Sequence, residues 1–137
     1  ALRRYSGRLD SELYIDNSRY MESEAVMLAL AALAQSTRLD VFRLLVRHEP
    51  KGLAAGDIAK AVAVPQSTMS SHLALLSRAG LVSARRSSRS IVYRADLTRF
   101  GAMIQFLLED CCGGRADLCM PTATSKRGRR VKARICP

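Results

Sequence analysis

Three of the four cysteines in this chain lie within nine residues, at Cys111, Cys112 and Cys119. Thiolates are soft ligands, so a close group of them can bind soft metal ions or trivalent metalloids, or undergo redox chemistry. Gly113 and Gly114 follow the first two cysteines and give the backbone freedom to bend beside them. The six residues between Cys112 and Cys119 are enough to return the third thiol to the other two. The spacing therefore predicts a three-thiol site.

The number of ligands indicates which species this site would hold. Structural zinc sites take four ligands, and neither His48 nor His72 lies near the cysteines in sequence. Arsenite or antimonite is satisfied by three thiolates in a pyramid. Cadmium, lead and copper(I) also accept soft thiolates, and Cys136 could then serve as a fourth ligand, although its place in the tail favours an incidental cysteine. A redox or sulfur signal acting on the same thiols is a further alternative.

The chain has 137 residues, enough for one domain with tails, and its net charge of +10 is unevenly distributed. Residues 121–137 contain six basic residues and no acidic residue. We expect this segment to be a disordered basic tail, because it has too little apolar content to fold. Residues 1–20 show no clear periodicity and are expected to be an N-terminal extension. A single domain over residues 21–120 remains.

The longest uninterrupted apolar run, residues 25–34, contains ten residues. A membrane-spanning helix needs about 20, and residues 1–20 contain no apolar signal core. We therefore expect a soluble, cytoplasmic protein with no membrane partner. In such a chain, clustered cysteines indicate metal, metalloid or redox chemistry rather than a disulfide framework.

Apolar periodicity predicts three helices in the first half of this domain. Residues 22–34 form the first helix, which is apolar nearly all round, so one face can pack in the core and another in a dimer contact. Ser36 or Thr37 caps the second helix, which ends before Pro50. The third helix covers residues 55–62. The inward-facing residues are predicted to be Leu39, Phe42, Leu45 and Val46 in the second helix, and Ile58, Ala59 and Val62 in the third.

The fourth predicted helix has the sharpest pattern. Pro65 suits its first position, Gly80 ends it, and Met69, Leu73 and Leu76 form one apolar stripe. The opposite face carries short hydroxyl, amide and imidazole side chains, which can reach phosphates and base edges without filling a groove of DNA. The residues predicted to contact DNA from this face are Gln66, Ser67, Thr68, Ser70, Ser71 and His72.

Two runs typical of strands follow, at residues 81–86 and 90–94, joined around Ser87 and Ser88. They predict a β-hairpin with a basic tip. Such a hairpin can lie against the DNA backbone or in the minor groove. The basic residues predicted to contact DNA from the hairpin are Arg85, Arg86 and Arg89.

The last predicted helix begins with Thr98 as its N-cap and ends at Gly113 and Gly114. Its apolar stripe is broad enough for packing in a dimer interface. The cysteine cluster therefore lies at the end of a helix expected to contact a second subunit. The apolar residues of the stripe are Phe100, Met103, Phe106, Leu107 and Leu108.

The order of these elements predicts a winged helix-turn-helix, mainly helical with a small β-hairpin. A polar helix face also occurs in proteins that do not bind DNA, but the adjacent basic hairpin favours double-stranded DNA as the partner. No histidine, carboxylate and nucleophile recur at a catalytic spacing, and no glycine-rich phosphate loop is present, so we do not expect an enzyme. The alternative is a thiol-based metalloid-binding or redox protein whose winged helix mediates only protein contacts.

Three segments strongly resemble the ArsR/SmtB family of metal-responsive bacterial repressors: residues 33–39 (LAQSTRL), 66–73 (QSTMSSHL) and 78–82 (RAGLV). The resemblance covers residues 26–112. It implies a homodimeric winged-helix protein whose first and last helices form the dimer interface and which binds an imperfect inverted repeat in operator DNA. It also implies that inducer binding weakens DNA binding and lifts repression.

The chain departs from the family's arsenic-sensing prototypes at their sensor positions. Those proteins carry cysteines in the helix before the recognition helix, where this chain has Ala54, Gly56 and Ala59. The C-terminal cysteine cluster is instead similar to that of another branch, whose arsenic site lies at the end of the last helix. On this resemblance and the ligand count, we expect arsenite or antimonite to act as inducer through the three clustered cysteines.

Overall fold

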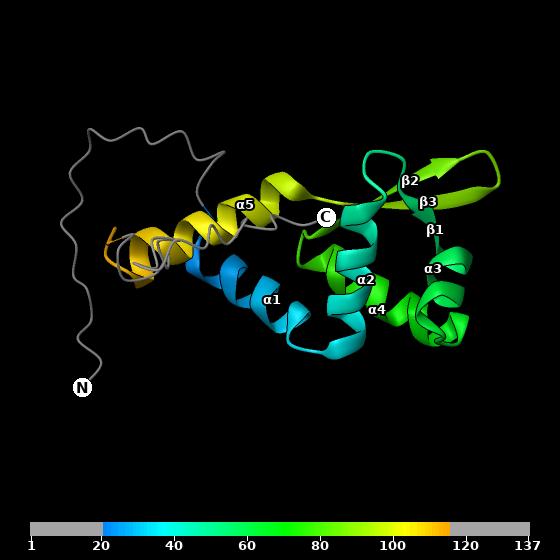
Figure 1. Ribbon diagram of the computed structural model, residues 1–137, viewed down its shortest axis with the longest axis horizontal. Helices are drawn as coiled ribbons and strands as arrows, with labels where there is room; N and C mark the ends of the chain where they lie inside the picture. Colours follow the sequence, from blue (N-terminus) through cyan, green and yellow to red (C-terminus); the bar gives the residue numbers. More distant parts are fainter. Residues whose placement is uncertain (1–20, 116–137) are drawn as a thin grey trace, which may run out of the picture.

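The computed structural model describes residues 21–115, and within them the winged helix-turn-helix expected from the sequence is confirmed. The predicted N-terminal extension and basic tail lie outside these residues. Helices α3 and α4 form the helix-turn-helix, and strands β2 and β3 form the wing (Figure 1). In chain order the elements are α1 (Ser23–Leu33), α2 (Ser36–Arg47), β1 (Leu53–Ala54), α3 (Ala55–Val62), α4 (Gln66–Arg78), β2 (Val82–Ser87), β3 (Ser90–Ala95), α5 (Leu97–Phe106) and the π-helix η1 (Leu107–Cys111).

The two functional regions predicted from the sequence lie at opposite ends of this part of the chain. Figure 1 shows α1 and α5 side by side at one end, and α3, the start of α4 and the hairpin at the other. Helix α2 runs between them. The polar face of α4 and the cysteines that follow α5 are therefore not neighbours, so any coupling between them must pass through the helices that connect the two ends.

Apolar side chains from all five α-helices and from the wing strands form one core, which fixes these ends relative to each other. The ring centroids of Phe42 in α2 and Phe100 in α5 are 5.1 Å apart, which ties the last helix to the centre of the domain. Helix α4 is anchored by the stripe predicted for it. The largest fully buried side chains are Met21, Val41, Leu45, Ile58, Met69, Leu73, Leu76 and Leu81.

The wing belongs to a three-stranded antiparallel sheet with the order β1-β3-β2, whereas the sequence predicted only a hairpin. Leu53 of β1 pairs with Tyr93 of β3. Two residues are too few to produce an alternating pattern, so β1 left no signal in the sequence. Strand β2 continues to Ser87, which pairs with Ser90. The turn therefore consists of Ser88 and Arg89 rather than Ser87 and Ser88.

The predicted N-caps of two helices were wrong. Gln35, not Ser36 or Thr37, caps α2, because its side-chain oxygen accepts a hydrogen bond of 2.8 Å from the backbone N–H of Arg38. Asp96, not Thr98, caps α5, with its carboxylate accepting from the backbone N–H of Arg99 at 2.8 Å. In both cases the residue just before the first helical turn has the extended backbone that a cap requires.

Three smaller expectations also needed correction. Leu39 is exposed rather than inward, because the buried face of α2 is centred on Val41, Phe42 and Leu45, and Leu39 lies roughly 110° from that centre at 3.6 residues per turn. Pro65 lies at the N-cap position of α4, with no capping hydrogen bond, instead of at the first helical position, which Gln66 occupies. The last helix does not stay α-helical to Gly113, since its end, from Leu107 onward, is a π-helix.

None of the helices within residues 21–115 is long and apolar enough to cross a membrane by itself. Helices α1 and α2 reach the required length and composition only when they are taken together, and the chain bends by 100° between them.

Candidate DNA interface and cysteine cluster

The polar face of α4 lies open to solvent. The opposite face of the helix is buried in the core through Met69, Leu73 and Leu76, each at most 1% exposed. This anchoring fixes the rotation of the helix, so the polar side chains point away from the protein. Ser70 donates a hydrogen bond of 3.0 Å from Oγ to the carbonyl oxygen of Gln66, and its oxygen can still accept one. The exposed residues of the predicted set are Gln66, Ser67, Thr68, Ser70 and Ser71.

His72 differs from the other five predicted contact residues on α4. It lies three residues after Met69 and four before Leu76, at the border between the buried stripe and the polar face. Its side chain is half-buried, and the Nδ1 atom is shielded from solvent without a hydrogen-bond partner among the described residues. The polar face open to a ligand is therefore centred on the first turns of the helix rather than on His72.

The three predicted wing arginines carry charges that are available to an anionic ligand. All three are exposed, and none forms an ion pair with another residue between positions 21 and 115. Arg85 pairs across the hairpin with Val92 and Arg86 with Ile91. Because successive side chains of a strand point to opposite faces, Arg85 and Arg86 extend from opposite sides of the wing. Arg89 lies in the turn.

Arg94 in the wing is not available in the same way. Its Nη2 atom lies 2.6 Å from Oε2 of Glu49, and its Nε donates to Oε1 of the same carboxylate at 3.4 Å. The hydrogen bond to Glu49, together with the negative charge of that carboxylate, raises the pKa of Arg94. No sequence pattern pointed to this pair, because its members are 45 residues apart.

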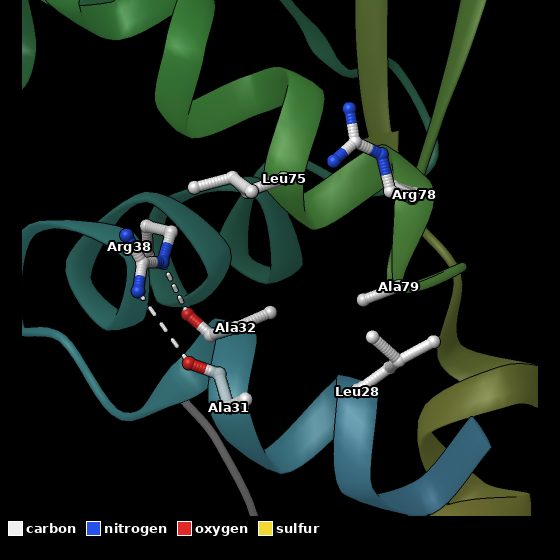
Figure 2. Close-up of a pocket in the computed structure, with 7 residues that line it drawn as sticks. All are labelled: Leu28, Ala31, Ala32, Arg38, Leu75, Arg78 and Ala79. Atoms are coloured by element: carbon white, nitrogen blue, oxygen red, sulfur yellow. Dashed lines mark hydrogen bonds between the residues drawn. The ribbon is translucent and has the colours of Figure 1, made fainter. Parts of the chain in front are cut away.

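The C-terminal end of α1 meets α2 and α4 around a hollow of about 250 Å³, shown in Figure 2. Arg38 of α2 binds carbonyl groups at the C-terminal end of α1. Its Nε donates at 2.6 Å to the carbonyl oxygen of Ala32, and a terminal nitrogen donates at 3.4 Å to that of Ala31. In Figure 2, Leu28 of α1 points toward Ala79 after α4, and Leu75 of α4 extends toward the side where Arg38 lies. Helix α1 is thus connected both to α2 and to the C-terminal half of α4.

The structure describes two of the three predicted metalloid ligands. Cys111 is the last residue of the π-helix and is exposed as a free thiol. Cys112 is half-buried and disulfide-bonded. Gly113 and Gly114 follow with φ of 60° and 71°, the left-handed conformation that glycine favours and that ends the helix as predicted.

Cys119 lies outside the described residues, so the convergence of three thiols stays a prediction. Between residues 21 and 115, no group of three or more histidine, cysteine or acidic side chains is arranged to hold a metal ion. The adjacent Cys111 and Cys112, with the glycines beside them, are the part of the predicted site whose backbone is defined.

A helix-turn-helix domain model matches residues 33–84, which include α2, α3 and α4. The chain is similar to the transcriptional activator HlyU of Vibrio cholerae, with 35% identity over 85 residues that cover 62% of this chain and 75% of that protein. The same protein, in a structure described as reduced HlyU, aligns with a TM-score of 0.51 and 31% identity, over 66% of this chain and 92% of that chain.

Two further solved structures are similar. The homodimeric winged helix-turn-helix DNA-binding domain of a possible ArsR-family regulator from Mycobacterium bovis has a TM-score of 0.51 and 30% identity, over 66% of this chain and 84% of that chain. An ArsR-like regulator from Rhodococcus has a TM-score of 0.60 at 23% identity, over 70% and 88% of the two chains, and supports the fold alone.

Proposed function

The chain belongs to the ArsR/SmtB-type winged-helix transcriptional regulators, and we propose that it is a repressor that binds an inverted-repeat operator as a homodimer and is released by arsenite or antimonite. As a transcriptional regulator it is not an enzyme, in agreement with the sequence. The specific proposals are the residues that contact DNA, the dimer interface, the inducer and its ligands.

The observation that carries DNA binding is the exposed polar face of α4 together with three exposed wing arginines, which form no ion pair within residues 21–115. A helix fits the major groove of B-DNA, and short hydroxyl and amide side chains at its start can donate to or accept from base edges and phosphates. The guanidinium groups of Arg85, Arg86 and Arg89 would neutralise backbone phosphates or enter the minor groove. Both features lie at the same end of the domain (Figure 1).

The opposite end offers a surface suited to a second copy of the chain. On α1, Met27 is 67% exposed and Leu28 54%, and Leu97 and Ile104 of α5 are also exposed. Large exposed apolar side chains on two adjacent helices are typical of a protein interface. The relative from Mycobacterium bovis is itself homodimeric. We therefore assign the dimer interface to α1 and α5, which would present two copies of α4 to successive major grooves.

The proposed inducer site consists of Cys111, Cys112 and Cys119. Arsenite, As(OH)₃, would exchange its three hydroxyl groups for three thiolates, and the three thiol protons leave in three water molecules. Exposed Cys111 and the positive-φ glycines after Cys112 support the proposal, because they allow the backbone to adjust as the sulfur atoms approach one another. Cadmium or lead would use the same soft ligands.

Ligand binding at the end of α5 would act on DNA through the dimer interface. Helix α5 packs beside α1 and contacts α2 through Phe100, while α1 is joined to α2 by Arg38 and borders α4 around the hollow in Figure 2. A change at the end of α5 would therefore alter how two copies of α4 are spaced. A coupling of about 1–3 kcal/mol would lower operator affinity about 5- to 150-fold.

The disulfide at Cys112 favours a second candidate signal. Oxidation of this thiol would remove one of the three thiolates that a metalloid needs, and it would itself change the conformation at the end of the last helix. One solved structure of a relative is described as reduced HlyU, so the redox state of that protein was specified. A redox-responsive regulator of the same architecture is therefore the alternative to the metalloid-responsive one.

An operator duplex selected from random DNA by the wild-type chain would test both proposals. Fluorescence anisotropy would measure its affinity under a non-thiol reductant, alone and with arsenite, antimonite, cadmium or zinc, and with peroxide after the reductant has been removed. Release by arsenite and antimonite at concentrations that leave the zinc-treated protein bound would support the metalloid proposal. Release by peroxide alone would support the redox alternative, and failure to select any duplex would overturn DNA binding.

A further inference from the structure

An ion pair joins the base of the wing to the end of α2. Glu49, two residues after α2, has a side chain only 16% exposed, and Arg94, next to the last residue of β3, is 36% exposed. Their closest nitrogen and oxygen atoms are 2.6 Å apart. The other ion pair within residues 21–115, Arg43 with Asp40, spans 3.7 Å between mostly exposed neighbours on one helix. Only the first pair connects separate elements.

Gly52 brings the backbone of the same turn against β3. Its φ is +72°, and a Cβ atom there would lie 2.6 Å from Cγ of Arg94 and in conflict with the carbonyl oxygen of Tyr93. The next residue, Leu53, pairs with Tyr93 in the sheet. The ion pair, the close approach at Gly52 and the β1–β3 pairing therefore hold β3 to one short segment of the helical body.

The register of the hairpin sets Arg94 on the same face as one of the predicted DNA contacts. Arg94 pairs across the strands with Ser83, and Val92 pairs with Arg85. Directly opposed residues share a face, as do residues two apart on a strand, so Arg85 and Arg94 extend from one side of the wing. The Glu49 carboxylate also lies on that side. Its negative charge would act on Arg85 and on DNA phosphates if Arg94 did not neutralise it.

We propose that Arg94 is a positioning residue for DNA binding: paired with Glu49, it sets the angle of the wing relative to α4 and neutralises a carboxylate next to the basic face, without contacting DNA itself. This inference rests on the proposed DNA-binding function. Arg94 thus differs from Arg85, Arg86 and Arg89, whose charges act directly on the ligand. Its loss should change how well the wing is placed rather than how many phosphates the protein neutralises.

Operator affinity measured by anisotropy over a range of salt concentrations separates these roles. We expect Arg94→Gln to weaken binding about 3- to 30-fold, the range for residues that act through their neighbours, with the salt slope unchanged. Glu49→Gln should weaken binding less, because the unpaired charge it leaves is the positive one of Arg94, which does not repel DNA phosphates. Adding Glu49→Gln to Arg94→Gln should cause no further loss. The exchanged pair Glu49→Arg with Arg94→Glu should recover most of the affinity.

Four results would overturn the inference. A fall of about 0.9 in the salt slope of Arg94→Gln, with Glu49→Gln harmless, would mean that Arg94 contacts a phosphate. A lower melting temperature with unchanged operator affinity would make the pair purely structural. Failure of the wild-type chain to bind any duplex would overturn the proposed function and this inference with it, whereas normal wild-type binding with additive losses in the double variant would overturn the inference alone.

Discussion

The two ends of this molecule rest on one core but expose opposite kinds of surface. At the end formed by α3, the start of α4 and the wing, the exposed side chains are mainly polar or arginine, and Ile91 is the large apolar side chain exposed there. At the end formed by α1 and α5, they include Met27, Leu28 and Ile104. Phosphates are recognised by the first kind of surface and a protein partner by the second. The comparison predicts that substitutions at the two ends fail in different ways.

The largest effect is expected for a charge on the apolar face of α1. Leu30→Glu would place a carboxylate in the proposed dimer interface, and the monomer could hold only one half-site. Because linked half-sites gain about 10²–10⁴ in affinity, operator binding should fall by at least about 100-fold.

Light scattering would report the loss of the dimer and anisotropy the loss of affinity. Leu39→Glu is a matched control, since Leu39 and Leu30 are each 41% exposed but Leu39 lies on α2. Equal losses in the two variants, or a dimeric Leu30→Glu protein, would show that the apolar face of α1 is not the interface.

The next effect is expected in the response to the inducer. Cys112→Ser should bind operator DNA normally, but arsenite should no longer lower its operator affinity. In the wild-type protein arsenite should lower that affinity about 5- to 150-fold. A three-thiolate site cannot form with a hydroxyl in place of one sulfur. The measurement is an arsenite titration of the DNA complex under a non-thiol reductant, with Cys136→Ser as the control that should respond like the wild type. Full release of the Cys112→Ser complex would exclude this residue from the sensor.

A smaller effect is expected at the tip of the wing. Arg89→Ala should lower the salt slope of operator binding by about 0.9, if this exposed guanidinium neutralises one phosphate. Arg43→Ala, on the exposed side of α2, removes the same charge away from the wing and should leave the slope unchanged. Matching slopes for wild type and Arg89→Ala would place Arg89 in solvent and leave the phosphate contacts of the wing to Arg85 and Arg86.

The proposed DNA-binding end was the more predictable from sequence. The spacing of Met69, Leu73 and Leu76 indicated both the helix and its buried side, and the exposed polar face followed from it. Apolar periodicity reports burial well when a helix has one buried side. The same periodicity predicted the buried face of α2 less well, because Leu39 fits the period but lies outside that face.

Contacts between distant segments were beyond sequence reasoning. Strand β1 has two residues, and its partner Tyr93 is 40 residues further along the chain. The Glu49–Arg94 pair and the closure of α1 by Arg38 likewise depend on how elements pack, which neither composition nor spacing encodes. The candidate cysteine site was recognisable from residue type alone, but the π-helix before it was not, since nothing in residues 107–111 departs from an α-helical pattern.

The smallest effect is expected in the turn between α3 and α4, where the backbone at the DNA-binding end is strained. Ala63 adopts φ 54° and ψ 45°, a left-handed conformation that costs an L-residue about 1–2 kcal/mol. Ala63→Gly removes this cost but adds about 0.4–1 kcal/mol of unfolded-state entropy. The free energy of unfolding should therefore rise by about 0.5 kcal/mol.

Ala61→Gly is the matched control, because Ala61 is also exposed but lies within α3, where glycine costs about 1 kcal/mol. Thermal unfolding should move the two variants in opposite directions with operator affinity unchanged, and a lower melting temperature for both would mean that the left-handed turn carries no strain.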